Sequence, residues 1–74
     1  MTGPGVYRIR VKGRLEPRWS DRLGGLSITT ETPEGGSVQS ALVGRLPDQA
    51  ALSGVLSTLY DLRLPLVSVE CLEG

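Results

Sequence analysis

The sequence contains no histidine and no phenylalanine, and it has a single cysteine, Cys71, among its 74 residues. Histidine is the usual general base near neutral pH, so its absence excludes a Ser-His or Cys-His nucleophile pair. One thiol without an imidazole supplies neither a common zinc-ligand set nor an internal disulfide. The eight carboxylates are not spaced as in a calcium-binding loop. The sequence therefore favours a non-enzymatic protein, with no catalytic, cofactor-binding or metal-binding residue.

Long apolar runs are also missing from the sequence. No run approaches the roughly 18–20 residues of a membrane span, and residues 1–8 lack the apolar core of a signal peptide. A lone cysteine suits a reducing compartment. We therefore expect a cytoplasmic protein with no membrane partner, folded as one small domain over residues 1–74, with residues 1–5 as a flexible N-terminus. Domains of this size have a thin stability margin, and oligomerisation is a common remedy.

The net charge is zero, but the charges are unevenly distributed along the chain. Residues 1–22 carry six basic side chains against two acidic ones, and residues 23–74 carry two basic against six acidic. Such an asymmetry can mark an anion-binding segment. It is equally compatible with two halves that neutralise each other after folding.

Three stretches of alternating polarity predict β-strands. In residues 6–15, Tyr7, Ile9 and Val11 share one side of the first strand, with basic residues on the other. Residues 16–25, broken by a proline and a Gly-Gly pair, predict a loop before a second strand at 26–31. The Pro-Glu-Gly-Gly turn then leads into a third strand at 37–45, which makes the second and third strands a hairpin.

The periodicity changes to that of a helix after Pro47. An apolar stripe recurs at helical spacing, and Asp48 is well placed as the N-cap. Gly54 lies in mid-helix, where we expect close approach to the sheet, and Pro65 ends the helix. The last strand covers residues 66–72 and places Cys71 on the side of Val67 and Val69, as a buried, inert thiol. The helical stripe comprises Leu52, Val55, Leu56, Leu59 and Leu62.

These elements predict an α+β fold of order β-β-β-α-β. We expect a mixed four-stranded sheet with one amphipathic helix on one face, and with the last strand beside the first and parallel to it. The other face of the sheet would be open, with acidic residues pairing across strands with the basic first strand. The residues expected on this open face are Arg8, Arg10, Lys12, Ser27, Thr29, Glu31, Gln39, Val43 and Glu70.

Residues 48–56 (DQAALSGVL) and 61–69 (DLRLPLVSV) resemble a family of small bacterial proteins of about this length. The family pattern is Asp-Gln-Ala-Ala-Leu-His-Gly-Leu-Leu followed by Asp-Leu-Gly-Leu-Pro-Leu-Leu-Ser-Val, and residues 12–15 and 19–26 also look like it. The resemblance implies a shared fold and no particular function. Two positions depart from the pattern. Ser53 replaces the helix histidine, and Arg63 replaces the glycine that would give the helix a left-handed cap cheaply.

The leading hypothesis for function is a small accessory or interaction protein that binds itself as a homodimer and also an unidentified protein partner. Its interface would be the open sheet face or an edge strand. The interface residues expected from the sequence are Trp19, Val43, Arg8, Arg10 and Lys12. For Trp19 two interpretations stay open, an exposed anchor for a partner and a lid over one end of the core.

Two alternatives remain. A single-stranded nucleic-acid-binding module would use the basic residues of the first strand and loop, although only three aromatic residues are present and Tyr7 lies with the apolar set. A small-ligand-binding protein would have its pocket near Trp19. The basic residues of the nucleic-acid hypothesis are Arg8, Arg10, Lys12, Arg18 and Arg22.

Overall fold

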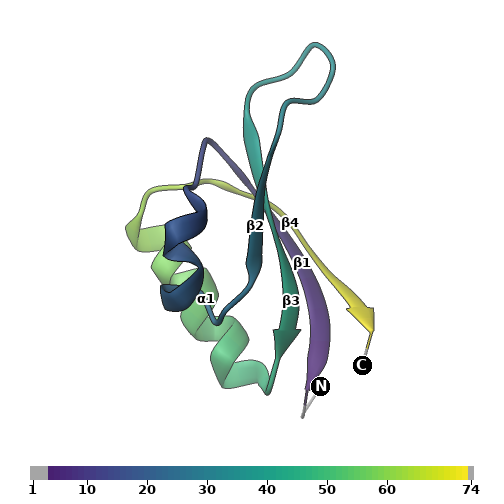
Figure 1. Cartoon of the computed structure of the whole chain (residues 1–74), viewed down its shortest axis with the longest axis vertical. Coiled ribbons are helices and arrows are strands. Elements are labelled where there is room, and N and C mark those ends of the chain that lie inside the picture. Colours follow the sequence, from purple (N-terminus) through teal and green to yellow (C-terminus); the bar gives the residue numbers. More distant parts are fainter. Residues whose placement is uncertain (1–3, 74) are drawn as a thin grey trace.

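The computed structural model describes residues 4–73 (Figure 1). Its elements are β1 (Gly5–Lys12), a 3₁₀ helix η1 (Pro17–Arg22), β2 (Ser27–Glu31), β3 (Gln39–Leu46), α1 (Gln49–Asp61) and β4 (Leu66–Glu73). The predicted α+β fold of order β-β-β-α-β is confirmed. Residues 1–3 of the expected flexible N-terminus lie outside the described residues, whereas Gly5 already belongs to β1.

The four strands form one sheet in the order β2-β3-β1-β4, so the last strand does lie beside the first. All three strand pairs are antiparallel, however, and the prediction of a mixed sheet is wrong. The reason is the path of residues 13–26, which return along the sheet so that β1 and β2 run in the same direction (Figure 1). Because β3 opposes both strands and α1 carries the chain back across, β4 runs parallel to β3 and antiparallel to β1.

Residues 16–25, predicted as a loop, contain η1. Backbone hydrogen bonds from Trp19 N to Glu16 O (3.1 Å) and from Leu23 N to Ser20 O (3.0 Å) form this short helix, and Ser20 Oγ donates to Leu26 O (2.6 Å). Leu23 and Leu26 are both fully buried. The segment therefore packs apolar side chains into the core and returns the chain to the start of β2.

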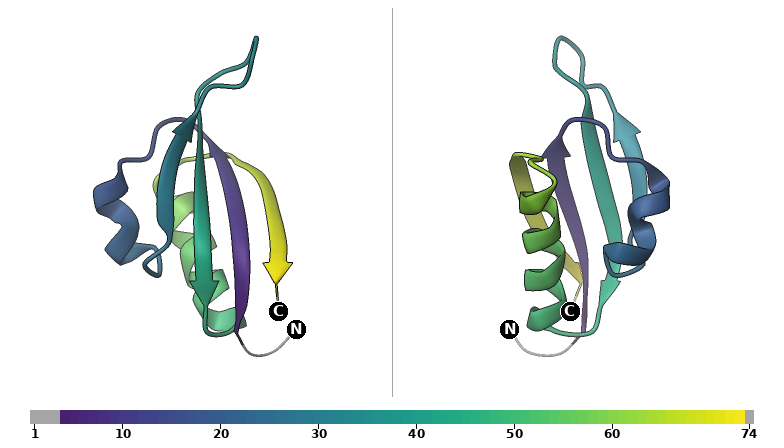
Figure 2. Two further views of the ribbon diagram at one scale, coloured as in Figure 1. Left: turned by 45° about the vertical axis from the view of Figure 1, so that its right-hand side comes forward. Right: turned by 90° about the vertical axis from the view of Figure 1, so that its left-hand side faces the viewer.

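The core lies on the side of the sheet where η1 and α1 are found (Figure 2). The predicted alternation of β1 places its apolar side chains in this core. The buried hydroxyl of Ser40 ties β3 to the segment that follows β1 by donating to Gly13 O (2.7 Å) and accepting from Leu15 N (2.8 Å). From α1, two members of the predicted stripe, Val55 and Leu59, are buried. The core cluster comprises Tyr7, Ile9, Val11, Leu15, Leu23, Leu26, Ile28, Leu42, Leu46, Val55 and Leu59.

Both ends of α1 are capped. Asp48 is the N-cap, as predicted, and its Oδ1 accepts a hydrogen bond from Ala51 N (2.8 Å). At the other end, Arg63 N donates to Tyr60 O (2.9 Å) and Leu64 N donates to Leu59 O (3.2 Å). This is the Schellman pattern, and it puts Arg63 in the left-handed region at φ 60°. The chain thus keeps the cap geometry that glycine favours, with arginine in the glycine position.

The prediction that Gly54 permits close approach of the helix to the sheet is wrong. Gly54 is exposed, and a Cβ added there would meet no atom within 4 Å. The close approach is found at Gly44 in β3, where a Cβ would lie 2.9 Å from Leu26 Cδ2. The glycine that close packing requires is therefore in the sheet, beneath the segment that leads into β2.

Candidate interaction site

The open face of the sheet is covered by ion pairs. Arg8 holds the Glu70 carboxylate with two hydrogen bonds, Nε to Oε1 (3.1 Å) and Nη2 to Oε2 (3.0 Å). Arg10 lies between two acidic partners, with Nη1 at 3.5 Å from Glu70 Oε1 and Nε at 3.4 Å from Glu31 Oε1. The predicted pairing of the basic first strand with acidic residues across strands is confirmed. The charge asymmetry of the sequence is therefore partly cancelled within the fold.

The Arg8–Glu70 pair also changes the titration of both groups. The hydrogen bond from Arg8, followed by the positive charges of Arg8 and Arg10, lowers the pKa of Glu70 from its ordinary value of 4.5, although partial desolvation opposes the change. The same hydrogen bond raises the pKa of Arg8. Both groups therefore stay charged across the neutral range, and neither has the pKa near 7 expected of a general acid or base.

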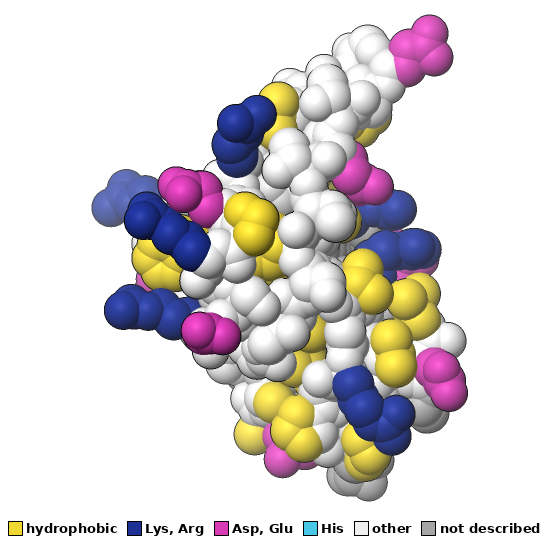
Figure 3. Space-filling view, viewed as in Figure 1, with side chains coloured by type: hydrophobic (Ala, Val, Ile, Leu, Met, Phe, Trp, Pro, Cys, Tyr) yellow, Lys and Arg dark blue, Asp and Glu magenta, His cyan; other side chains and the backbone are white. Residues whose placement is uncertain are grey.

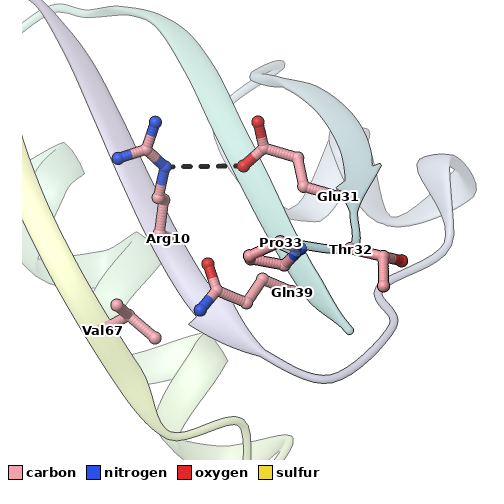
Figure 4. A pocket seen from close by; sticks show the side chains of 6 residues that line it. All are labelled: Arg10, Glu31, Thr32, Pro33, Gln39 and Val67. Carbon is pink, nitrogen blue, oxygen red and sulfur yellow. Dashed lines mark ion pairs between the residues drawn. The ribbon is translucent and has the colours of Figure 1, made fainter. Parts of the chain in front are cut away.

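One open hollow of about 480 Å³ lies on this face, at the end nearest the β2–β3 turn (Figure 4). Val67 of β4 lies on one side of it, and the Arg10–Glu31 ion pair and Gln39 lie on the other. Thr32 and Pro33 form its remaining wall. Two of its polar groups, Arg10 and Glu31, already pair with each other. The hollow is therefore a shallow depression of the open face whose charged groups are held in an ion pair.

The interface residues expected from the sequence do not form one surface. Arg8, Arg10 and Val43 share the open face, since Val43 pairs with Arg8 in the β1–β3 register, and Lys12 lies exposed at the end of β1. Trp19, by contrast, belongs to η1 and packs partly buried against the core on the other side of the sheet.

The basic residues of the nucleic-acid hypothesis are divided in the same way. Arg8 and Arg10 are held in ion pairs on the open face, whereas Arg18 and Arg22 lie on η1. The Arg22 guanidinium stands 5.5 Å from the centroid of the Trp19 ring, and Arg18 Nε lies 3.3 Å from Glu16 Oε2. Basic and acidic side chains are mixed on this side of the molecule (Figure 3). Within residues 4–73, the arginines of β1 and those of η1 thus lie on opposite sides of the sheet.

Trp19 and its two neighbouring arginines line a second hollow, which we call the Trp19 hollow. Its volume is about 380 Å³, and its lining residues are Arg18, Trp19 and Arg22. Of the two interpretations of Trp19, the structure supports parts of both. The ring contacts the core cluster, yet one side of it borders the hollow.

The feature that the sequence reasoning missed is the apolar surface of β4. Four β4 side chains are exposed although they are large and apolar, and one of them, Leu66, lies beside Tyr60 of α1, which is 82% exposed. Apolar side chains stand among charged ones on the right-hand side of Figure 3, away from α1 and η1. The β4 apolar surface comprises exposed side chains on both faces of the strand, with Val67 on the open face and Leu66 and Val69 on the inward face. Its residues are Leu66, Val67, Val69 and Leu72 together with Tyr60.

A groove runs alongside this surface, between α1 and the start of β4. Its volume is about 180 Å³, and nearly all of its wall is apolar. The lining residues are Leu56, Leu59, Tyr60, Leu64, Pro65 and Leu66. A sequence signal for this surface existed, because residues 64–67 and 69 are apolar without strict alternation, as expected for a strand whose two sides are both apolar.

Irregular pairing explains why β4 departs from the predicted alternation. Its register against β1 shifts twice, between the partners of Arg10 and Val11 and between those of Val6 and Tyr7. The first shift puts Leu66, rather than Val67, on the side of Val69 and Cys71. The prediction of a buried Cys71 is also wrong, since the thiol is exposed on this edge strand. Edge position and irregular pairing leave the inward-facing side of β4 largely uncovered.

The described part of the chain, residues 4–73, shows no group of three or more cysteine and acidic side chains close enough to hold a metal ion. None of the helices in that part is long and apolar enough to cross a membrane.

Comparison with known proteins places the chain in a family. A family model described as a domain of unknown function (DUF8691) matches residues 6–70, which cover β1 and all but the end of β4. No curated protein and no solved structure matches the chain significantly. The matched residues run from β1 through α1 into β4, and the chain belongs to the family of the DUF8691 domain of unknown function.

Proposed function

We propose that the protein is a small non-enzymatic interaction protein that acts as a homodimer through its β4 edge. The observation that carries this proposal is the β4 apolar surface, on a strand with one free side. Natural edge strands are commonly protected from pairing by lysine, by proline or by being short. β4 has eight residues and contains neither lysine nor proline. The bacterial origin and cytoplasmic location expected from the sequence stay part of this proposal.

The open face is the weaker candidate for the interface. Its ion pairs are partly solvated, with 34% of the Arg8 side chain and 40% of the Glu70 side chain exposed. Covering them with a partner would remove water from charged groups, which costs free energy unless the partner supplies new bonds. Burial of the β4 edge has less of this cost, because Glu70 is its one ionised side chain between Leu66 and Leu72 and removing apolar area from water is favourable.

The size of the molecule supports the same choice. A standard interface buries roughly 800 Å² on each partner, about a sixth of the 4707 Å² accessible surface of this chain. The β4 apolar surface, the adjoining groove and the free strand edge together extend along the length of β4, which makes an interface of that order feasible.

Native mass spectrometry and light scattering over a range of protein concentrations test the proposal. We expect a dimer for the natural sequence, a monomer for Val69→Lys, and an unchanged dimer for Thr29→Lys, which puts the same charge on the β2 edge. Circular dichroism would establish that both variants are folded. A natural chain that stays monomeric at high micromolar concentration would contradict the proposal.

The Trp19 hollow supports a second candidate, a site for a small anionic ligand or a phosphate of single-stranded nucleic acid. Two guanidinium groups beside an indole ring can combine charge with stacking. Trp19 is the only tryptophan, so its fluorescence reports directly on this hollow. Titration with inorganic phosphate and with oligothymidylate at low salt should change the emission and lose the effect at high salt. An unchanged spectrum would remove this candidate.

A further inference from the structure

We propose that two copies join β4 to β4 in antiparallel pairing, across a twofold axis that passes between the two Val69 residues. The two four-stranded sheets would then form one continuous sheet. This inference rests on the proposed homodimer and adds its register. Pairing through a twofold axis requires the same strand on both sides, and residue i must face residue j whenever j faces i.

The geometry of β4 leaves few registers. Its pairing with β1 is regular only from Ser68 to Cys71, between the two register shifts. Residues directly opposite in an antiparallel pair share a face of the sheet, whereas neighbouring residues of one strand lie on opposite faces. A residue therefore cannot face the copy of its own neighbour, and the twofold axis must pass through a residue. Within the regular stretch the central candidates are Val69 and Glu70.

Charge decides between these two registers. With Glu70 on the axis, two carboxylates would face each other directly, and like charges in opposite positions destabilise a strand pair. With Val69 on the axis, Val69 faces Val69 of the second copy, and each Ser68 faces a Glu70. The second register puts an apolar pair at the centre and no charge opposite a like charge.

The charge of Glu70 does not prevent this approach, because it is balanced from within its own chain. Glu70 is the one ionised side chain between Leu66 and Leu72, and the bidentate bond from Arg8 and the contact from Arg10 neutralise it. The edge therefore lacks the bare charge that would repel another strand.

Ser68 supplies a separate observation in favour of the same register. Among residues 4–73, its Oγ is the one enclosed side-chain oxygen that has no hydrogen-bond partner. An enclosed hydroxyl without a partner carries a desolvation cost. In the proposed register, rotation about χ1 would direct this hydroxyl toward the Glu70 carboxylate of the second copy, which retains free acceptor positions beside the arginine bonds.

The ends of the paired strands also match. Outside the regular stretch the register shifts of β4 prevent direct facing, but antiparallel pairing about Val69 still brings the start of one strand beside the end of the other, so Leu66 lies near Leu72 of the second copy. Leu66 lines the apolar groove beside Tyr60, and Leu72 is 45% exposed in the single chain. The groove at one end of each strand thus lies next to an exposed leucine of the other chain, twice per dimer.

Disulfide trapping tests the register. Directly opposite residues have Cα atoms about 4.5–5.5 Å apart, within the roughly 4.4–6.8 Å that a disulfide spans. Val69→Cys in a Cys71→Ser background should therefore form a covalent dimer under mild oxidation. Two matched controls in the same background, Leu72→Cys on β4 and Thr29→Cys on β2, should stay uncrosslinked. Two copies of residue 72 would lie roughly 20 Å apart along the paired strands.

The natural thiol gives a second measurement that needs no substitution. Cys71 is exposed and is the only cysteine. In the proposed register the two Cys71 residues lie roughly 13 Å apart along the strands, which is too far for a disulfide and within reach of a bis-maleimide linker of that span. The natural protein should be joined by the linker and not by oxidation. This readout stands even if the Val69→Cys protein fails to fold.

The outcomes separate the register from the homodimer itself. Crosslinking of Val69→Cys together with linker capture of Cys71 supports the register. A dimer by native mass spectrometry in which Leu72→Cys crosslinks, or in which neither readout gives a product, overturns the register and leaves the homodimer standing. A monomer by native mass spectrometry overturns both.

Discussion

The two edges of the sheet differ in how they treat their apolar residues. On β2, Ile28 is the only apolar residue among five, and its side chain is 8% exposed against the core. On β4, four apolar side chains remain exposed, including Val69 at 38%. The difference follows from what lies beside each strand. η1 contacts β2, whereas β4 lies at the far edge, and its irregular pairing leaves the inward side largely uncovered. An edge strand thus becomes an interface candidate when the covering layer stops short of it.

Alanine substitutions at matched positions of β2 and β4 should show the largest difference in the free energy of unfolding. Ile28→Ala removes a buried side chain and should lower the free energy of unfolding by roughly 2–4 kcal/mol. Val69→Ala should cost less than about 1 kcal/mol in dilute protein, because the side chain is partly exposed there. Urea unfolding at low and high protein concentration measures both effects. If β4 is an interface, the cost of Val69→Ala should grow with concentration and that of Ile28→Ala should not.

Substitution of glycine tests how tightly the molecule is packed beside β2. Gly44→Ala would place a Cβ 2.9 Å from Leu26 Cδ2 and 3.4 Å from its Cα, just before β2 begins. We expect a loss of roughly 1–3 kcal/mol from this overpacking. Gly54→Ala is the matched control at an exposed helix position with no neighbouring atom within 4 Å, and it should stabilise the protein by about 1 kcal/mol. Thermal unfolding of both variants measures the difference, and equal effects would contradict the packing described for β2.

The sequence was most informative where local chemistry decides the structure. Period-two alternation placed the β1 side chains correctly, and the capping preference of aspartate identified Asp48. The direction of β4 could not be obtained in this way, because it depends on the route of residues 13–26. That route is fixed by burial of Leu23 and Leu26, which follow a proline and adjoin the Gly-Gly pair that suggested an ordinary loop.

The candidate site was less predictable for a related reason. An alternating pattern assigns residues to two faces, but it does not say whether a helix covers a given strand. Cys71 was assigned to the inward side correctly and is nevertheless exposed. The register shift at Val67 could not be derived from sequence because β4 contains no glycine or proline to indicate it. The interface residues expected from the sequence were therefore basic residues of the open face and Trp19, and not the apolar residues of the β4 edge.

A substitution in the turn that leads into β4 should have a smaller effect on stability. Arg63 adopts φ 60° to complete the helix cap, a conformation that costs an L-residue roughly 1 kcal/mol more than glycine. Arg63→Gly should therefore stabilise the monomer by about 0.5–1 kcal/mol, offset in part by the flexibility of glycine in the unfolded chain. Denaturant midpoints measure this change. Because the side chain of Arg63 lies outside the β4 apolar surface, the dimer dissociation constant should not change. A lower midpoint for the variant would contradict the assigned cap.

The smallest effect concerns the carboxylates of the two edges, Glu70 on β4 and Glu31 on β2. Glu70 accepts contacts from two arginines, whereas Glu31 lies against Arg10 alone at 3.4 Å. Because the pKa of Glu70 is lowered in the folded protein, its ion pairs stabilise the fold at pH values above the ordinary carboxylate value of 4.5. That contribution is lost as the pH falls through the lowered pKa.

Glu70→Gln should therefore be less stable than the natural protein at pH 7, and the two should converge in acid. Glu31→Gln is the matched control and should show a smaller difference at pH 7. Urea unfolding from pH 7 down to the acid limit of folding measures both. A Glu70→Gln deficit that persists at the acid end would show that the carboxylate acts through packing and not through its charge.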